Sequence, residues 1–106
     1  LKPDEAFEAL ERNPPTIEVT KRPSARTTDG FAVISGVART TGRARDVMVY
    51  HGEDKIFYEG GTGSAGIKPF TVERKLSPGP HSFYILVRDE NGLMATESVH
   101  VWAEES

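Results

Sequence analysis

Hydrophobic and polar residues alternate with a period of two along most of the chain from Thr16 onward. Such alternation is typical of strands that bury one face, because successive side chains of a strand point to opposite sides. Runs rich in valine, isoleucine, phenylalanine and tyrosine recur between turn signals. They predict seven strands, at Thr16–Lys21, Phe31–Ala38, Asp46–His51, Lys55–Tyr58, Pro69–Leu76, His81–Asp89 and Leu93–Trp102.

The connections between these runs carry the residue types that tight turns need. They are Asp29-Gly30, Thr41-Gly42, Gly52-Glu53-Asp54, Ser77-Pro78-Gly79-Pro80 and Asp89-Glu90-Asn91-Gly92. No helical pattern lies between the predicted strands, which disfavours parallel β-α-β units. We predict an all-β domain over residues 16–106, an immunoglobulin-like antiparallel β-sandwich of about seven strands.

Residues 1–15 contain the only helical pattern. Asp4 is a suitable N-cap, Phe7 and Leu10 lie on one helical face, and the proline pair that begins at Pro14 ends the pattern. A helix of about two and a half turns is marginal unless it packs on something. We expect this segment to be a linker or the end of a preceding domain. The chain begins with leucine rather than methionine, which suggests a piece of a longer protein.

Length and composition limit the possible functions. A chain of 106 residues has room for one domain with one core. The absence of cysteine excludes disulfides, thiolate metal sites and a cysteine nucleophile. The net charge of −3 gives no strong overall attraction to nucleic acid, and no apolar run approaches the roughly 20 residues of a membrane-spanning helix.

The glycine-rich segment from Glu59 to Phe70 contains the spacing G-x-G-x-x-G at Gly61, Gly63 and Gly66. In dinucleotide-binding proteins that spacing opens a helix, whose free N–H groups meet a pyrophosphate. Here the glycines precede an alternating pattern that predicts a strand. We therefore predict a mobile loop between two strands and no cofactor.

Residues with catalytic or metal-binding chemistry are scattered along the chain. His51, His81 and His100 have neither helical spacing nor a carboxylate cluster, so no metal site is predicted. Ser98 shares a strand face with His100, but the sequence locates no acid or oxyanion pocket for a catalytic triad. The Asp89–Gly92 segment is better explained as a hairpin turn than as a calcium loop. No catalytic, cofactor-binding or metal-binding residue is predicted.

The strand alternation predicts an apolar outer surface on one sheet. If the valines of the third, sixth and seventh predicted strands point inward, the opposite set points outward, and these strands are neighbours in an immunoglobulin-like sandwich. A contiguous patch of this kind is usually covered in a monomer. Our hypothesis is a docking face; the alternatives are that the N-terminal helix covers it or that its members are scattered. We define the docking face as Met48, Tyr50, Tyr84, Leu86, His100 and Trp102.

A basic segment lies between Lys21 and Arg45, where Asp29 is the single acidic residue. It could form a basic patch for an acidic protein or envelope surface, or simply a solvated face. Nucleic acid is disfavoured because Phe31 is the only aromatic residue available for base stacking. The predicted basic patch comprises Lys21, Arg22, Arg26, Arg39, Arg43 and Arg45.

Six short strings stand out: PPTIEV at 14–19, ISGVA at 34–38, DVMVY at 46–50, KIFY at 55–58, LSPG at 76–79 and VRDENGL at 87–93. Together they resemble bacterial immunoglobulin-like accessory domains. More narrowly, they resemble the domain appended after the PDZ and catalytic domains of some bacterial carboxy-terminal processing (tail-specific) serine proteases. The resemblance covers about residues 14–102.

The resemblance implies a noncatalytic domain of a periplasmic or secreted protease. It would dock on the catalytic or PDZ domain of the parent chain, on a second copy or on a partner protein. The serine and lysine of that protease chemistry belong to a catalytic domain and match no residue here. The chain departs from similar domains at Arg39–Gly42 and Pro80-His81, which weakens any calcium-type ligation at the strand ends. The alternative is a carbohydrate- or surface-binding adhesion module of another secreted protein.

Overall fold

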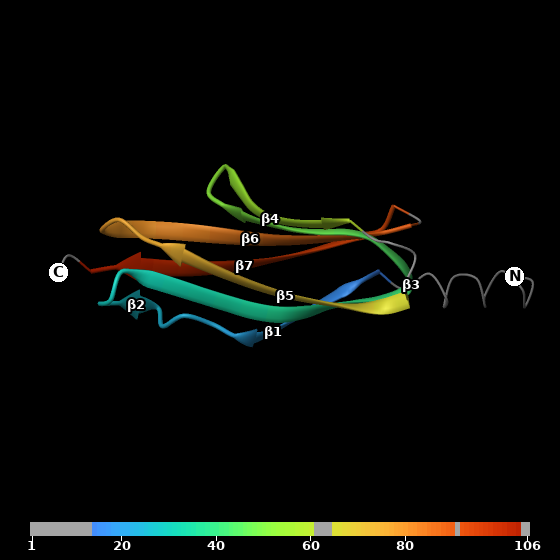
Figure 1. Cartoon of the computed structure of the whole chain (residues 1–106), viewed down its shortest axis with the longest axis horizontal. Coiled ribbons are helices and arrows are strands. Elements are labelled where there is room, and N and C mark those ends of the chain that lie inside the picture. The colour runs from blue at the N-terminus through green and yellow to red at the C-terminus, as the bar shows by residue number, and fades with distance from the viewer. Residues whose placement is uncertain (1–13, 61–64, 91, 105–106) are drawn as a thin grey trace, which may run out of the picture.

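The strands of the domain form two facing layers (Figure 1). A computed structural model describes residues 14–60, 65–90 and 92–104. Its seven strands are β1 (Thr16–Lys21), β2 (Arg26–Thr27), β3 (Phe31–His51), β4 (Asp54–Gly60), β5 (Ala65–Lys75), β6 (Gly79–Asp89) and β7 (Met94–Ala103). The predicted all-β sandwich is confirmed. The helix predicted within residues 1–15 lies outside the described residues, except for its final proline pair, and within the described part no helix is long and apolar enough to span a membrane.

The two sheets share the long strand β3. Its first part pairs with β1 on one side and with β5 on the other, and we call these strands the first sheet. Its second part, from Ala44, pairs with β4 and β6, and the second sheet continues through β7 to the short parallel strand β2. In Figure 1, β3 runs through both layers. β3 is therefore a member of both sheets, and it fixes their positions relative to each other.

Two sequence-based expectations about strand boundaries were wrong. The chain does not turn at Thr41-Gly42: β3 continues, with an irregular register between Arg39 and Arg43, so one strand replaces two predicted ones. A strand can change sheets by such an irregularity without a reversal of direction. The pattern also missed β2, which is only two residues long and pairs with the end of β7.

The inner faces of the two sheets form one hydrophobic core. The first sheet contains a close contact at Gly36, where an added Cβ would lie 2.5 Å from the carbonyl oxygen of Glu18 and 2.6 Å from the Phe70 ring. Only glycine leaves room for that ring. The central fully buried residues are Ile34, Val47, Val49, Phe83, Ile85 and Val87.

Aspartates organise two of the predicted turns. Asp29 Oδ1 accepts hydrogen bonds from the Thr27 hydroxyl at 2.7 Å and from the Phe31 amide at 3.0 Å. Asp89 Oδ1 likewise accepts from the Leu93 amide at 2.9 Å. Side chains of this kind substitute for backbone partners in turns. The carboxylate of Asp89 is thus engaged by its own hairpin.

The glycine-rich segment leads into a strand, as predicted. That strand, β5, begins at Ala65, four residues before the predicted start at Pro69. Gly66 is therefore in β5, where its φ of 78° is a backbone conformation that favours glycine. Residues 61–64, on which the predicted mobile loop depends, lie outside the described residues.

Candidate docking face

Strand register brings four of the six docking-face residues together. Met48 on β3 lies opposite Leu86 on β6, and Tyr50 lies opposite Tyr84. Residues opposite each other on neighbouring strands project from the same face of the sheet, with Cβ atoms about 5 Å apart. These four side chains are therefore neighbours on the outer face of the second sheet.

The other two members of the docking face lie farther along the strands. On β6 and β7, Tyr84 pairs with Ser98, Ser82 pairs with His100, and the next outward position on β7 is Trp102. Two residues along a strand span about 7 Å, so His100 and Trp102 are about 7 and 14 Å beyond the Tyr84 row. The structure thus separates the set into a central group of four and a pair near β2.

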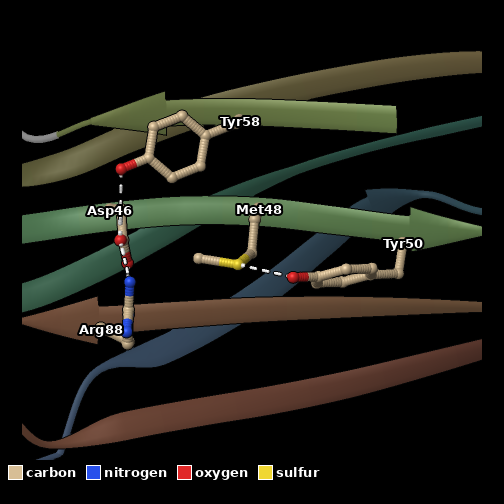
Figure 2. A network of polar contacts seen from close by, with 5 residues as sticks. All are labelled: Asp46, Met48, Tyr50, Tyr58 and Arg88. Atoms are coloured by element: carbon tan, nitrogen blue, oxygen red, sulfur yellow. Dashed lines mark hydrogen bonds and ion pairs between the residues drawn. The ribbon is translucent and has the colours of Figure 1, made fainter. Parts of the chain in front are cut away.

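Met48 has the predicted outward direction, but it is buried, with only 4% of its surface exposed. It forms the floor of a hollow of about 410 Å³. In Figure 2, its side chain lies between Asp46 and Tyr50. The Tyr50 hydroxyl donates to the Met48 sulfur at 3.3 Å. Exposure was wrongly predicted because strand parity gives the direction of a side chain and not what its neighbours cover. The hollow is lined by Met48, Tyr50, Lys55, Tyr58, Leu86 and Arg88.

Three further residues of this outer face escaped the sequence analysis. Tyr58 on β4 lies directly opposite Met48 and is 55% exposed, and Met94 on β7 is 56% exposed. The ammonium group of Lys55 lies 5.2 Å from the Tyr58 ring centroid and 5.9 Å from that of Tyr50, within cation–π range. The alternation of β4 carried the signal for Tyr58 and Lys55, and the alternation of β7 carried it for Met94.

An ion pair between the buried Asp46 and the partly exposed Arg88 lies at one end of the hollow (Figure 2). Arg88 donates from Nε to Asp46 Oδ1 at 2.8 Å and from a second nitrogen to Oδ2. The Tyr58 hydroxyl also reaches Oδ2, at 3.4 Å. The hydrogen bond from Arg88 holds the pKa of Asp46 below its usual range, and the same contact raises the pKa of Arg88. The pair therefore stays charged and fixes the position of Tyr58.

The residues of the predicted basic patch are not gathered in one place. Arg26 is next to the Phe31 end of β3, because Thr27 contacts the Phe31 carbonyl, whereas Arg39 lies eight positions along that strand, about 26 Å away. Both are paired with carboxylates. The side chain of Arg43 is not among those described.

Carboxylates neutralise three of these cations. Arg26 contacts Glu104 at 2.6 Å, Arg39 contacts Glu18 at 3.3 Å, and Arg22 contacts Glu97 at 3.7 Å. All six partners are substantially exposed, and such pairs add little to stability. Lys21 and Arg45 are exposed. The basic patch therefore stays a prediction, with no concentrated cluster to support it.

The three histidines, which the sequence placed in separate elements, form two different contacts. His51 and His81 are hydrogen-bonded, with 2.8 Å between Nε2 and Nδ1. His100 Nδ1 lies 2.9 Å from the Ser82 hydroxyl. The register between β3 and β6, which no sequence motif encodes, brings the first two together. Among the described residues, no three His, Cys, Asp or Glu side chains are grouped to hold a metal ion.

Comparison with solved structures shows what kind of fold presents this face. The chain is similar to the fibronectin(III)-like modules of Clostridium thermocellum CbhA, with 16% sequence identity and a TM-score of 0.61. The match covers 86% of this chain and 99% of that one. No protein-family model and no curated protein matches the chain. The domain therefore has an immunoglobulin-like β-sandwich fold, and the narrower resemblance to protease-appended domains stays a prediction.

Proposed function

We propose that this domain is a noncatalytic accessory module that binds a protein partner through the outer face of its second sheet. One observation carries the proposal: Tyr58, Tyr84, Met94 and Trp102 are each about half exposed, and all four project from that face. Aromatic residues and methionine are enriched in protein interfaces, where they contribute much of the binding energy. The fibronectin(III)-like fold is consistent with an accessory role.

The central hollow gives this face a defined shape. Met48 forms an apolar, adaptable floor, and the rings of Tyr50 and Tyr58 stand beside it. Because the Asp46–Arg88 pair and the strand pairing hold these groups, little side-chain entropy is lost when a partner binds. We expect an apolar side chain of the partner to occupy the hollow.

The finer proposal concerns the parent protein. We infer that the domain follows the catalytic part of a tail-specific serine protease in the periplasm or another secreted location, and that it docks on the catalytic or PDZ domain or on a second copy. The sequence strings described above support this proposal. The gene product upstream of Leu1 tests it: a PDZ domain and a serine-lysine catalytic domain are expected. A glycosidase or further immunoglobulin-like repeats there would overturn it.

Charge substitution tests the face itself. Tyr84→Lys and Trp102→Lys should each weaken self-association or binding to the isolated protease domain by about 10- to 100-fold, as expected for interface hot spots. Ile67→Lys is the matched control, because Ile67 is 59% exposed but lies on the first sheet. Sedimentation velocity and calorimetric titration provide the two readouts. Unchanged association in both assays would remove the docking proposal.

A chain that begins at Pro14 addresses the alternative occupant of the face. If residues 1–13, with Phe7 and Leu10, cover it, their removal should strengthen association and increase the binding of a hydrophobic dye. An unchanged result would exclude that covering and leave the external partner.

A second candidate function is binding to carbohydrate or to a cell surface. Its support is that three aromatic rings, of Tyr58, Tyr84 and Trp102, are exposed on one face and could stack on sugar rings. Titration of the labelled domain with soluble glycans, followed by NMR, separates the two candidates. Saturable shifts confined to these residues would favour the carbohydrate role, and their absence together with protein binding would favour the first.

A further inference from the structure

A line of hydrogen bonds joins the two sheets at one end of the sandwich. Arg74 on β5 donates from Nε to His51 Nδ1 at 3.0 Å, and His51 Nε2 lies 2.8 Å from His81 Nδ1. His81 Nε2 in turn lies 2.6 Å from the carbonyl oxygen of Ser77. The His51 ring stacks on Phe83, with centroids 4.5 Å apart. We call Arg74, His51, His81 and the Ser77 carbonyl the histidine clasp.

The chemistry of the two ends fixes the protons of both rings. An arginine is always a donor, so His51 must present the lone pair of Nδ1 to it and carry its own proton on Nε2. That proton is donated to His81 Nδ1, which leaves the His81 proton on Nε2, facing the Ser77 carbonyl. A carbonyl only accepts, so the assignment is consistent from one end to the other. Both rings are neutral and have the same tautomer.

Neither ring accepts a further proton without the loss of a hydrogen bond. A proton on His51 Nδ1 would face the Arg74 donor, and one on His81 Nδ1 would face the proton of His51. Breaking the line would leave groups at the edge of the core without partners. Arg74 belongs to the first sheet and both histidines belong to the second. Protonation in acid therefore breaks hydrogen bonds that connect the two sheets.

Most of the charged groups around the clasp oppose a positive charge on His51 in addition to that of Arg74. Arg74 and Lys75 face it from β5, and His81 faces it from β6. The carboxylate of Asp54, on β4, lies 3.7 Å from Arg74 and favours a positive charge on His51. Burial lowers the pKa of His51, and His81 and Arg74 lower it further, against the smaller effect of Asp54.

We propose that the histidine clasp is an acid-sensitive lock that stabilises the junction of the two sheets at neutral pH and is lost on mild acidification. A hollow of about 440 Å³, lined by the clasp and by Lys75 and Leu76, gives solvent protons access to it. The unfolded chain binds protons on these histidines below about pH 6.5. In the closed clasp, a further proton on either ring costs one of the hydrogen bonds that join the sheets. The stability that the clasp provides is therefore complete above that pH and decreases below it.

Two measurements test the proposal. Ring ¹⁵N shifts at pH 7.5 should place both His51 and His81 in the neutral tautomer with the proton on Nε2. Urea unfolding at pH 7.5 and 5.0 measures the linkage: each histidine that stays neutral in the fold should increase the unfolding constant by about 10- to 30-fold over this interval.

The variant His81→Asn separates this effect from other titrating groups. Its amide oxygen can still accept the hydrogen bond from His51 but cannot be protonated. The increase in the unfolding constant between pH 7.5 and 5.0 should therefore be about 10- to 30-fold smaller than in the unmodified protein. His100→Asn, at an exposed position on β7, is the matched control and should retain the full effect. Equal acid effects in all three proteins would overturn the proposal. If His81→Asn fails to fold, the ¹⁵N shifts decide: a charged ring or the other tautomer at pH 7.5 would overturn it.

Discussion

The two parts of β3 have different surroundings, although they belong to one strand. In the first part, Ala32, Ile34 and Ala38 are buried, while the alternate residues are partly or fully exposed. In the second part, the four consecutive residues Asp46–Val49 are all buried. The first part is covered on one side only, and the second on both. The outer face of the second sheet is thus a packed layer in its own right.

The difference lies in how the outward side chains of the two sheets are held. On the first sheet, the hydroxyls of Ser35 and Thr71 meet at 3.1 Å in an outward contact that is exposed to solvent. On the second sheet, the side chains around the hollow bury a methionine and a carboxylate that both point outward. Local packing of this kind holds the exposed rings in place.

Gly36→Ala should have the largest effect, because the added methyl group would collide with the backbone of β1 and with the Phe70 ring. We expect a loss of about 2–3 kcal/mol in the free energy of unfolding, as for overpacked cores. Urea denaturation measures it. Gly60→Ala is the matched control, because its nearest contact would be the flexible Tyr58 side chain at 3.8 Å. Equal losses at the two glycines would contradict the close packing of the first sheet.

Met48→Ala should lower the free energy of unfolding by about 2 kcal/mol, near the lower limit for a buried methionine. Val33→Ala, also outward on β3 but in the first part and partly exposed, should cost less than about 1 kcal/mol. Thermal and urea unfolding of the two variants compare the parts of β3 directly. Indistinguishable losses would mean that the outer layer contributes nothing to stability.

Asp46 should make the free energy of unfolding depend on pH in the acidic range. Because its pKa is lowered in the fold, its contribution is complete above the ordinary aspartate value of about 3.9 and is lost as the pH falls through the folded value. Asp46→Asn should cost about 1–2 kcal/mol at pH 7 and flatten the stability profile between pH 5 and 3. Glu18→Gln, in an exposed pair, should leave that profile nearly unchanged. If Asp46→Asn leaves the pH dependence of the free energy of unfolding unchanged, the lowered pKa of Asp46 is refuted.

Arg39→Gln should have the smallest effect. Its contact with Glu18 at 3.3 Å is exposed on both sides, so the free energy of unfolding should change by less than about 0.5 kcal/mol. Added salt should reduce this change further, because exposed ion pairs are screened. A loss comparable to that of Asp46→Asn would mean that the two outer faces are equally structured.

Strand periodicity predicted most strands to within a few residues and gave the outward direction of the docking face. It could not give the burial of Met48, which depends on Tyr58 across a β-bridge. Neither could it detect β2, because two residues contain no periodicity and their pairing is set by the end of β7. The proximity of His51 and His81 likewise depends on register between strands 30 residues apart in sequence. The local sequence pattern determines to which side of the sheet a side chain points, and the pairing of distant strands determines which side chains it contacts.

The course of β3 also has a mechanical consequence. In Figure 1, β1 begins near one end of the sandwich and β7 finishes at the opposite end. A pulling force applied through neighbouring segments of a longer protein would pass from β1 to β3, then to β6 and β7. Because β3 is one continuous polypeptide across both layers, covalent bonds carry the tension between them, and the hydrogen bonds of the ladders are loaded in shear.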